Sequence, residues 1–288
     1  MESDDDIRGA LRERILLLDG ATGTMLLPYS GGDSVDRLNE TAPDIVAGLH
    51  RAYLAAGADI IKTNTFNGLS RETARTGARI AREAARAARR SRPVWVAGSI
   101  GPAVPDPEGQ IAGLVEGGAD LLLVETCCDI RRTEHILAAA RCIAPDIPVI
   151  VSVTPLDPTG RTLSGLLPEA FRSAARTGSL LAFGLNCFPA TEDYRPLVRR
   201  TALSGDAPFC CCPNAGLPDA AGRHPVTPEQ FASFFETVWE ERPAGIAGGC
   251  CGTTPAHVAA LNANLAAREA YFRKTKKTAS TRQTKAAR

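Results

Sequence analysis

Short apolar runs alternate with longer amphipathic stretches eight times along this chain, and this alternation limits the folds open to it. Strands that alternate with helices predict a parallel sheet, and eight such units in about 270 residues fit a closed (β/α)8 TIM barrel. An open doubly wound sheet is the alternative, but no G-x-G-x-x-G segment follows the first apolar run. The expected strands are residues 15–19, 59–66, 94–99, 120–125, 148–154, 180–187, 208–213 and 245–249, and the expected helices are 44–56, 70–90, 131–143, 169–177, 194–203, 228–241 and 255–272.

The third connection is unusually short. Residues 103–118 separate the third expected strand from the fourth, and Pro105, Pro107 and Gly109 disfavour a helix in the first half of this segment. About eight residues, 110–117, remain for a helix, which is near the lower limit for a crossover between parallel strands. We therefore expect an α/β TIM barrel with a shortened third helix region, whose wall is thin or open at this point.

The charges divide the chain into three parts. Residues 1–14 form an acidic N-terminal lead, residues 15–272 form the barrel, and residues 273–288 form a tail with seven Lys or Arg and no acid. The chain up to residue 272 carries 26 basic and 32 acidic residues, a net charge of −6, which disfavours a nucleic-acid partner. The tail lacks large apolar residues, so we expect it to be disordered.

Membrane and secreted proteins are disfavoured by the same sequence. No uncharged apolar run approaches the ~20 residues that a membrane-spanning helix needs. Residues 1–6 read MESDDD, which is acidic where a secretory signal is basic and then apolar. We therefore expect a cytoplasmic protein with no membrane partner.

The nine cysteines are clustered, and in a reducing compartment clustered thiols indicate a metal or catalysis rather than disulfides. Cys187 ends the sixth expected strand, and Cys250 and Cys251 end the eighth, where Gly248, Gly249 and Gly252 allow the backbone to turn so that both thiols face one site. Three thiolates at one barrel mouth predict a tetrahedral Zn²⁺ site with a position left for substrate, although soft ligands also suit an iron–sulfur cluster. Residues 210–212, all cysteine, precede the seventh strand end and are expected in the core, with Cys212 as a weaker candidate ligand.

Polar residues and glycines gather where the other apolar runs stop. In a TIM barrel the active site lies at the carboxyl ends of the strands, so these residues are expected to share one mouth. The strand-end segments are residues 19–20, 63–66, 99–102, 125–126, 186–187, 213–216 and 248–252.

Several of these segments together resemble the zinc-dependent homocysteine S-methyltransferase family. The resemblance covers about residues 15–265 and rests on LDGATGT at 18–24, DIIKTNTF at 59–66, DLLLVET at 120–126, GLNC at 184–187 and GGCCGTT at 248–254. Within the family, PNAGLP at 213–218 and GRTLSG at 160–165 are most similar to the homocysteine-binding module of cobalamin-dependent methionine synthase.

The resemblance implies a role for each of these residues. Cys187, Cys250 and Cys251 would hold Zn²⁺, and the sulfur of homocysteine would take the open position as a thiolate and accept a methyl group, giving methionine. Asp19 and Glu125 would pair with the ammonium group of the substrate. Asn64 and Asn214 would lie on the substrate side, and Asn64, Thr65, Asn186 and Asn214 would orient ligands and loops.

The methyl donor is left open by the sequence. No segment resembles a corrinoid-binding D-x-H-x-x-G motif, so methylcobalamin would arrive as a free cofactor or on a separate corrinoid-binding protein. S-methylmethionine or betaine as donor is a second hypothesis, and a zinc-binding barrel without turnover is a third. Lys62 stands where the family often has an acidic or apolar residue, and we expect it to affect local pairing rather than zinc.

Overall fold

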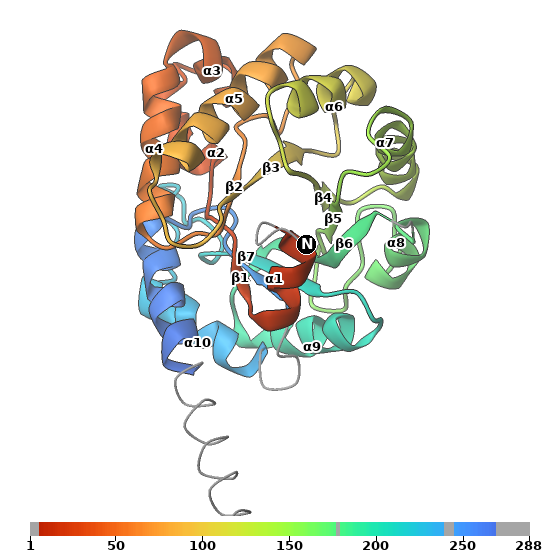
Figure 1. The fold of residues 1–288 in the computed structure, drawn as a ribbon. Coiled ribbons are helices and arrows are strands. Elements are labelled where there is room, and N and C mark those ends of the chain that lie inside the picture. The colour runs from red at the N-terminus through yellow and green to blue at the C-terminus, as the bar shows by residue number, and fades with distance from the viewer. Residues whose placement is uncertain (1–5, 177–178, 239–244, 269–288) are drawn as a thin grey trace, which may run out of the picture.

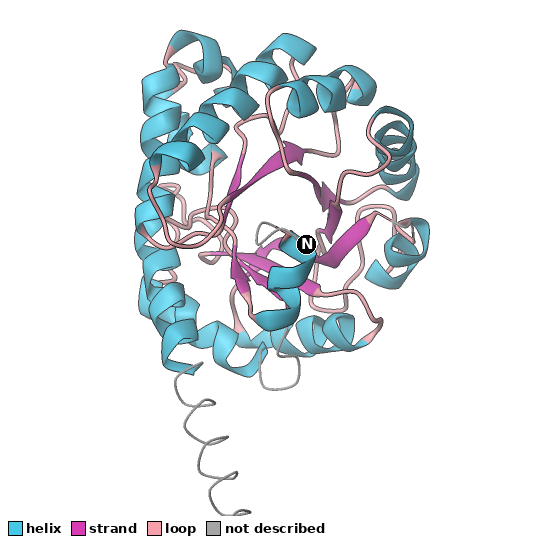
Figure 2. Cartoon of the chain, in the orientation of Figure 1, coloured by secondary structure: helices cyan, strands magenta, loops and turns pink. Residues whose placement is uncertain are grey.

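Eight parallel strands form one sheet that closes into a barrel in the computed structural model, which describes residues 6–176, 179–238 and 245–268 (Figures 1 and 2). The strand order β1-β8-β7-β6-β5-β4-β3-β2 leaves β1 and β2 at the two edges, and a parallel bridge between Leu18 and Ile60 joins them. The predicted TIM barrel is therefore confirmed, and the doubly wound alternative is excluded. The strands are β1 (Leu16–Leu17), β2 (Ile60–Lys62), β3 (Trp95–Ile100), β4 (Leu121–Cys127), β5 (Val149–Val153), β6 (Leu180–Pro189), β7 (Phe209–Asn214) and β8 (Gly245–Ala247).

Helices surround the barrel, as Figure 2 shows in cyan. Their starts follow local capping chemistry: Ser70 caps α5 through the N–H of Thr73, and Pro228 opens α10 directly after Thr227, as predicted. The helices are α1 (Ile7–Glu13), α2 (Gly23–Leu26), η1 (Leu27–Tyr29), η2 (Val35–Arg37), α3 (Leu38–Thr41), α4 (Pro43–Ala55), α5 (Arg71–Ala87), α6 (Pro107–Glu116), α7 (Ile130–Ile143), α8 (Pro168–Ala174), η3 (Glu192–Tyr194), α9 (Arg195–Leu203) and α10 (Pro228–Val238), and residues 255–268 are helical as well.

The third connection contains a short helix, as predicted, but the wall is not open there. The helix α6 begins at Pro107 rather than at residue 110, because a proline fits the first helical position and the Asp106 carboxylate caps the N–H of Gly109 at 2.9 Å. It packs against α5 on one side and α7 on the other. Gly113 permits this fit, since a Cβ atom there would collide with the carbonyl oxygen of Arg71 in α5. A ten-residue helix therefore closes the wall.

Two layers of apolar side chains make up the core. One lies between the strands and the surrounding helices, and the other fills the barrel interior. The alternation of side chains along a strand separates them: Leu16 and Leu18 point inward, whereas Leu17 packs under the helices. Cys210 and Cys212 belong to the interior layer and Cys211 to the outer one, so the prediction that residues 210–212 are core residues is confirmed.

The helix α1 covers the amino-terminal end of the barrel, and Figure 1 shows it across the near opening. Ile7 and Leu11 are buried against the interior layer, and the Arg8 guanidinium donates to the carbonyl oxygens of Ser179 and Leu180 at 3.2 Å. The predicted tail, residues 273–288, lies outside the described residues. Among the described helices, none combines the length and apolar character that a membrane span requires.

Candidate active site

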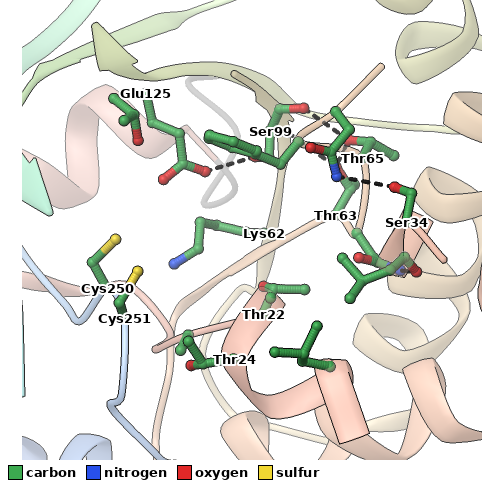
Figure 3. A pocket seen from close by; sticks show the side chains of 18 of the residues that line it. Thr22, Thr24, Ser34, Lys62, Thr63, Thr65, Ser99, Glu125, Cys250 and Cys251 are labelled. Atoms are coloured by element: carbon green, nitrogen blue, oxygen red, sulfur yellow. Dashed lines mark hydrogen bonds between the residues drawn. The ribbon is translucent and has the colours of Figure 1, made fainter. Parts of the chain in front are cut away.

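A cavity of about 590 Å³ opens at the carboxyl ends of the strands, opposite α1. Its floor holds Lys62 from β2, Ser99 from β3 and Glu125 from β4, and one side holds Cys250 and Cys251 from the turn after β8 (Figure 3). Cys187 from β6 lines the same cavity. The opposite side is formed by the loops that follow β1 and β2, including residues 21–24, 33–35 and 63–67. The mouth predicted from the strand ends is therefore a real cavity.

Three cysteines meet at one side of this cavity. The sulfur atoms of Cys187, Cys250 and Cys251 all lie within 4.8 Å of one another, and those of Cys187 and Cys251 are 3.7 Å apart. Cys187 reaches the cluster from a backbone in the left-handed region, with φ of 58°. Among the described residues, this is the one group of three or more Cys, His, Asp or Glu side chains with metal-ligand spacing.

The turn after β8 explains how two adjacent cysteines face one site. The strand ends at Ala247, and the Cys250 N–H then donates to the carbonyl oxygen of Pro213 at 2.8 Å, which pulls the chain toward β7. Gly252 has φ of 76°, a conformation that glycine adopts without steric cost. The predicted backbone turn is present, although it uses a positive φ at Gly252 and not at Gly248 or Gly249.

The cysteine cluster fits a zinc ion. Thiolates at ~2.3 Å from Zn²⁺ in a tetrahedron lie ~3.8 Å from one another, close to the sulfur separation of Cys187 and Cys251. Hydrogen bonds within the cluster raise the pKa of Cys187 and lower the pKa of Cys251. All three side chains are half-buried, and they line the cavity, which leaves a further ligand position open toward it.

The Asp19 carboxylate is not free, in contrast to what the family resemblance implied. It is buried, its Oδ1 lies 2.9 Å from the Nζ of Lys62, and its Oδ2 accepts the backbone N–H of Lys62 at 2.9 Å. Burial raises the pKa of Asp19, and the Lys62 ammonium opposes that rise. Lys62, rather than Asp19, lines the cavity.

The Lys62 ammonium has three acceptors around it. It forms an ion pair with Asp19 and donates to the carbonyl oxygens of Gly20 at 2.8 Å and Gly249 at 3.3 Å. Burial lowers its pKa, but the carboxylates of Asp19 and Glu125 outweigh burial and hold the pKa above the usual lysine value, so the group is charged. Figure 3 shows this ammonium pointing toward the side of the cavity where Glu125, Cys250 and Cys251 lie.

Glu125 lies where it was predicted, in the cavity floor. Its Oε1 accepts from the Ser99 hydroxyl at 2.6 Å and its Oε2 from the Asn186 side chain at 3.4 Å. Burial raises the pKa of Glu125 to about 7, against the lowering effect of Lys62. The Asn186 amide also lies 3.8 Å from the Cys250 sulfur, so Asn186 connects the carboxylate with the thiol cluster.

The two predicted asparagines differ in position. Asn64 lines the cavity, but its amide donates to the carbonyl oxygen of Val35 at 2.7 Å and to Asn39 at 3.2 Å, so it holds the loops after β1 and β2 together. Asn214 is the last residue of β7 and is buried outside the cavity lining. Thr65 bonds to Thr63 at 2.6 Å and to the carbonyl oxygen of Ser99 at 2.8 Å, which fixes the second loop.

Sequence reasoning placed Ser99 at the barrel mouth, but it did not place Lys62 in the cavity floor. The alternation of side chains along a strand gives the direction of both residues. Ile60 and Ala97 point into the barrel, so Lys62 and Ser99, two positions later, point the same way. Lys62 is also the only lysine among residues 1–273. A lysine at an inward position of a strand end is a buried charge that needs a partner nearby.

Comparison with known proteins agrees with this geometry. The model of the homocysteine S-methyltransferase family matches residues 16–265. The homocysteine methyltransferase MmuM from Escherichia coli is 25% identical in its metallated form, with a TM-score of 0.72 over 89% of this chain and 99% of that one. Its apo form gives 25% identity and a TM-score of 0.70 over 87% and 96%.

A more distant structure, N-acetylneuraminate lyase from Mycoplasma synoviae, shares the barrel fold at 17% identity and a TM-score of 0.53 over 91% of this chain and 77% of that one. The family match, in contrast, spans all eight strands and the three clustered cysteines. The chain belongs to the homocysteine S-methyltransferase family.

Proposed function

We propose that this protein transfers a methyl group to the thiol of homocysteine, giving methionine, at a zinc ion held by Cys187, Cys250 and Cys251. The observation that carries the proposal is the cluster of three thiols on the wall of a cavity large enough for a small thiol substrate. Zinc bound there would keep an incoming thiol deprotonated at neutral pH, where a free thiol with a pKa of ~8.5 is mostly protonated.

The residues around the cluster support binding and orientation of the acceptor. Glu125 is a buried carboxylate beside the thiols and is placed to pair with the ammonium group of homocysteine. Asn186 holds Glu125 and approaches Cys250, which fixes the distance between the ammonium and sulfur positions. The candidate partners for the acceptor carboxylate lie in residues 19–24: the N–H groups of Thr22, Gly23 and Thr24 line the cavity at the start of α2, whereas those of Asp19 and Ala21 donate within the protein.

The transfer itself is a displacement at carbon. The acceptor sulfur attacks the methyl carbon in line with the bond to the carrier, so that a sulfur–carbon bond forms while the methyl–carrier bond breaks. The electron pair of the broken bond leaves with the carrier. The thiol proton would pass to solvent when the acceptor binds, so no base would have to act during this step.

Methylcobalamin, free or on a separate corrinoid-binding protein, is the donor that we propose. Support comes from the segments at 160–165 and 213–218, which resemble the cobalamin-dependent module; the first lies in the loop after β5, and the second runs from the end of β7 into the loop that follows it, both on the carboxyl face of the barrel. Leu27, Leu163 and Leu217 are exposed there by 61%, 71% and 64%, so a large donor meets an open, apolar rim. S-methylmethionine and betaine are the competing donors.

The test is methionine formation from homocysteine by zinc-loaded protein, run in parallel with methylcobalamin, S-methylmethionine and betaine. Turnover with methylcobalamin alone is the expected result. Turnover with a sulfonium or ammonium donor alone would keep the acceptor chemistry and overturn the proposed donor. Zinc bound at one ion per chain without turnover of any donor would favour a barrel that only binds.

A further inference from the structure

We infer that Lys62 weakens the requirement for an amino group on the acceptor, so that this site also takes ω-mercaptocarboxylates that lack one. The inference rests on the proposed function, because it concerns which thiols reach the three cysteines. It starts from the ion pair between Lys62 and Asp19, which joins the ends of β1 and β2 in the cavity floor.

The ion pair removes one negative charge from the site. The Asp19 carboxylate is 1% exposed, and both of its oxygens face Lys62, one toward the ammonium and one toward the backbone N–H. The Lys62 ammonium forms an ion pair with Asp19 Oδ1 and donates to the carbonyl oxygens of Gly20 and Gly249. Lys62 therefore cancels the charge of Asp19 and, because it lines the cavity, covers Asp19 from it.

One carboxylate then remains in the floor to attract an ammonium group. Among the described residues that line the cavity, the carboxylates are Glu125 and Asp33, and Asp33 is exposed on the loop after β1. An acceptor ammonium group that binds close to Glu125 is also repelled by the Lys62 ammonium. The amino group of an acceptor thus gains the attraction of one buried carboxylate, opposed by a fixed ammonium, and its removal costs little affinity.

A shorter, neutral side chain at position 62 should make the site prefer acceptors that carry an amino group. Lys62→Thr uncovers Asp19 and leaves its carboxylate unpaired, so an ammonium group gains a second anionic partner. Replacing both members of the pair, in Asp19→Asn with Lys62→Thr, removes both charges and should restore the wild-type preference. Arg14→Met is the matched control, since it breaks an ion pair with the buried Asp59 at the opposite end of the barrel.

The experiment is calorimetric binding of homocysteine and of 4-mercaptobutyrate, its analogue without the amino group, to zinc-loaded proteins of equal zinc content. In the wild type we expect the two dissociation constants to lie within about tenfold of each other. Lys62→Thr should raise the preference for homocysteine by at least about tenfold, while the double variant and Arg14→Met keep the wild-type ratio.

Either of two results would overturn the inference and leave the proposed function intact. One is a wild-type preference for homocysteine above about a hundredfold, and the other is a ratio of the two dissociation constants that Lys62→Thr leaves unchanged. The wild-type comparison needs no variant, so a folding defect in Lys62→Thr would not protect the inference. If neither thiol binds to the zinc-loaded protein, the proposed function fails and the inference fails with it.

Discussion

Each end of the barrel has a buried aspartate that accepts a backbone N–H and pairs with a basic side chain, but the surroundings of the two aspartates differ. At the amino end, the buried carboxylate of Asp59 accepts the backbone N–H of Leu17 at 3.1 Å and pairs with Arg14 at 2.6 Å. At the carboxyl end, Asp19 accepts the backbone N–H of Lys62 and pairs with its ammonium. Each carboxylate ties β1 to β2, where the strands themselves share a single bridge.

The difference lies in what surrounds each pair. Asp59 is close to two further guanidinium groups, of Arg90 and Arg92, at an end that α1 covers. The Asp19 pair borders the cavity and the thiol cluster. We therefore expect charge at the amino end to affect stability alone, whereas charge at the carboxyl end, which borders the cavity, should also affect what binds.

The largest effect is expected from removal of a thiol at the carboxyl end. Cys250→Ser should abolish zinc binding and lower the rate of methionine formation by at least about a thousandfold, because the acceptor thiol is no longer held as a thiolate. Cys142→Ser, at an exposed cysteine of α7, is the control and should change neither. Zinc content and kcat/KM measure the effect, and unfolding of Cys250→Ser would show instead that the ion is structural.

Removal of a charge at the amino end should lower stability and leave activity unchanged. Asp59→Asn removes the charge that Arg14 faces and weakens the acceptor of the Leu17 N–H, so the free energy of unfolding should fall by about 3 kcal/mol or more. Zinc content and kcat/KM of the folded protein should stay unchanged. Urea unfolding followed by circular dichroism gives the first quantity. A loss of activity without a loss of stability would remove the distinction between the two ends.

A smaller effect is expected at the link between Glu125 and the cysteines. Asn186→Ala removes an amide that donates to Glu125 and lies beside Cys250, and such supporting contacts typically change metal affinity or activity by about 10–100-fold. Competition with a chromophoric chelator measures the zinc affinity. Because Asn186 also accepts the N–H of Thr126, Asn186→Asp is a useful second variant that keeps an acceptor there.

The smallest effect is a dependence on pH through Glu125. Burial raises its pKa to about 7, so the carboxylate becomes negative as the pH rises through 7 and the KM for homocysteine should fall over that range. The KM for 4-mercaptobutyrate corrects for ionisation of the thiol, and Glu125→Gln should remove the difference between the two profiles. A difference that persists in Glu125→Gln would assign the titration to another group.

The same shift affects stability in the metal-free protein. Because the folded-state pKa of Glu125 lies above the unfolded value, the folded state binds more protons between the two. The contribution of Glu125 to stability is therefore full below pH 4.5 and is lost as the pH rises through about 7.

The strands and the cysteine cluster could be predicted from the sequence because both depend on local signals. Apolar runs mark the eight strands, and parallel strands bring their carboxyl ends to one face, so Cys187, Cys250 and Cys251 had to come close. The start of α6 was misplaced because Pro107 was taken as a helix breaker, whereas at a first helical position it is favourable.

The state of Asp19 could not be predicted in the same way. Its pairing depends on the register between β1 and β2, two segments more than forty residues apart, and neither segment encodes that register alone. Asn214 shows a similar limit: β7 extends one residue further than expected, which keeps this side chain within the sheet and out of the cavity lining.

The pairing of β1 with β8 has a consequence for how the protein is made. Leu16 and Leu17 lie beside Ile246 and Ala247, so β1 cannot pair with β8 until β8 has been synthesised. During synthesis on the ribosome, a chain that has not yet emerged past residue 251 has neither a closed barrel nor the complete set of three thiols. If the cluster binds zinc as proposed, metal loading would be a late step in maturation, and the half-made sheet exposes two strand edges that a chaperone would be expected to shield.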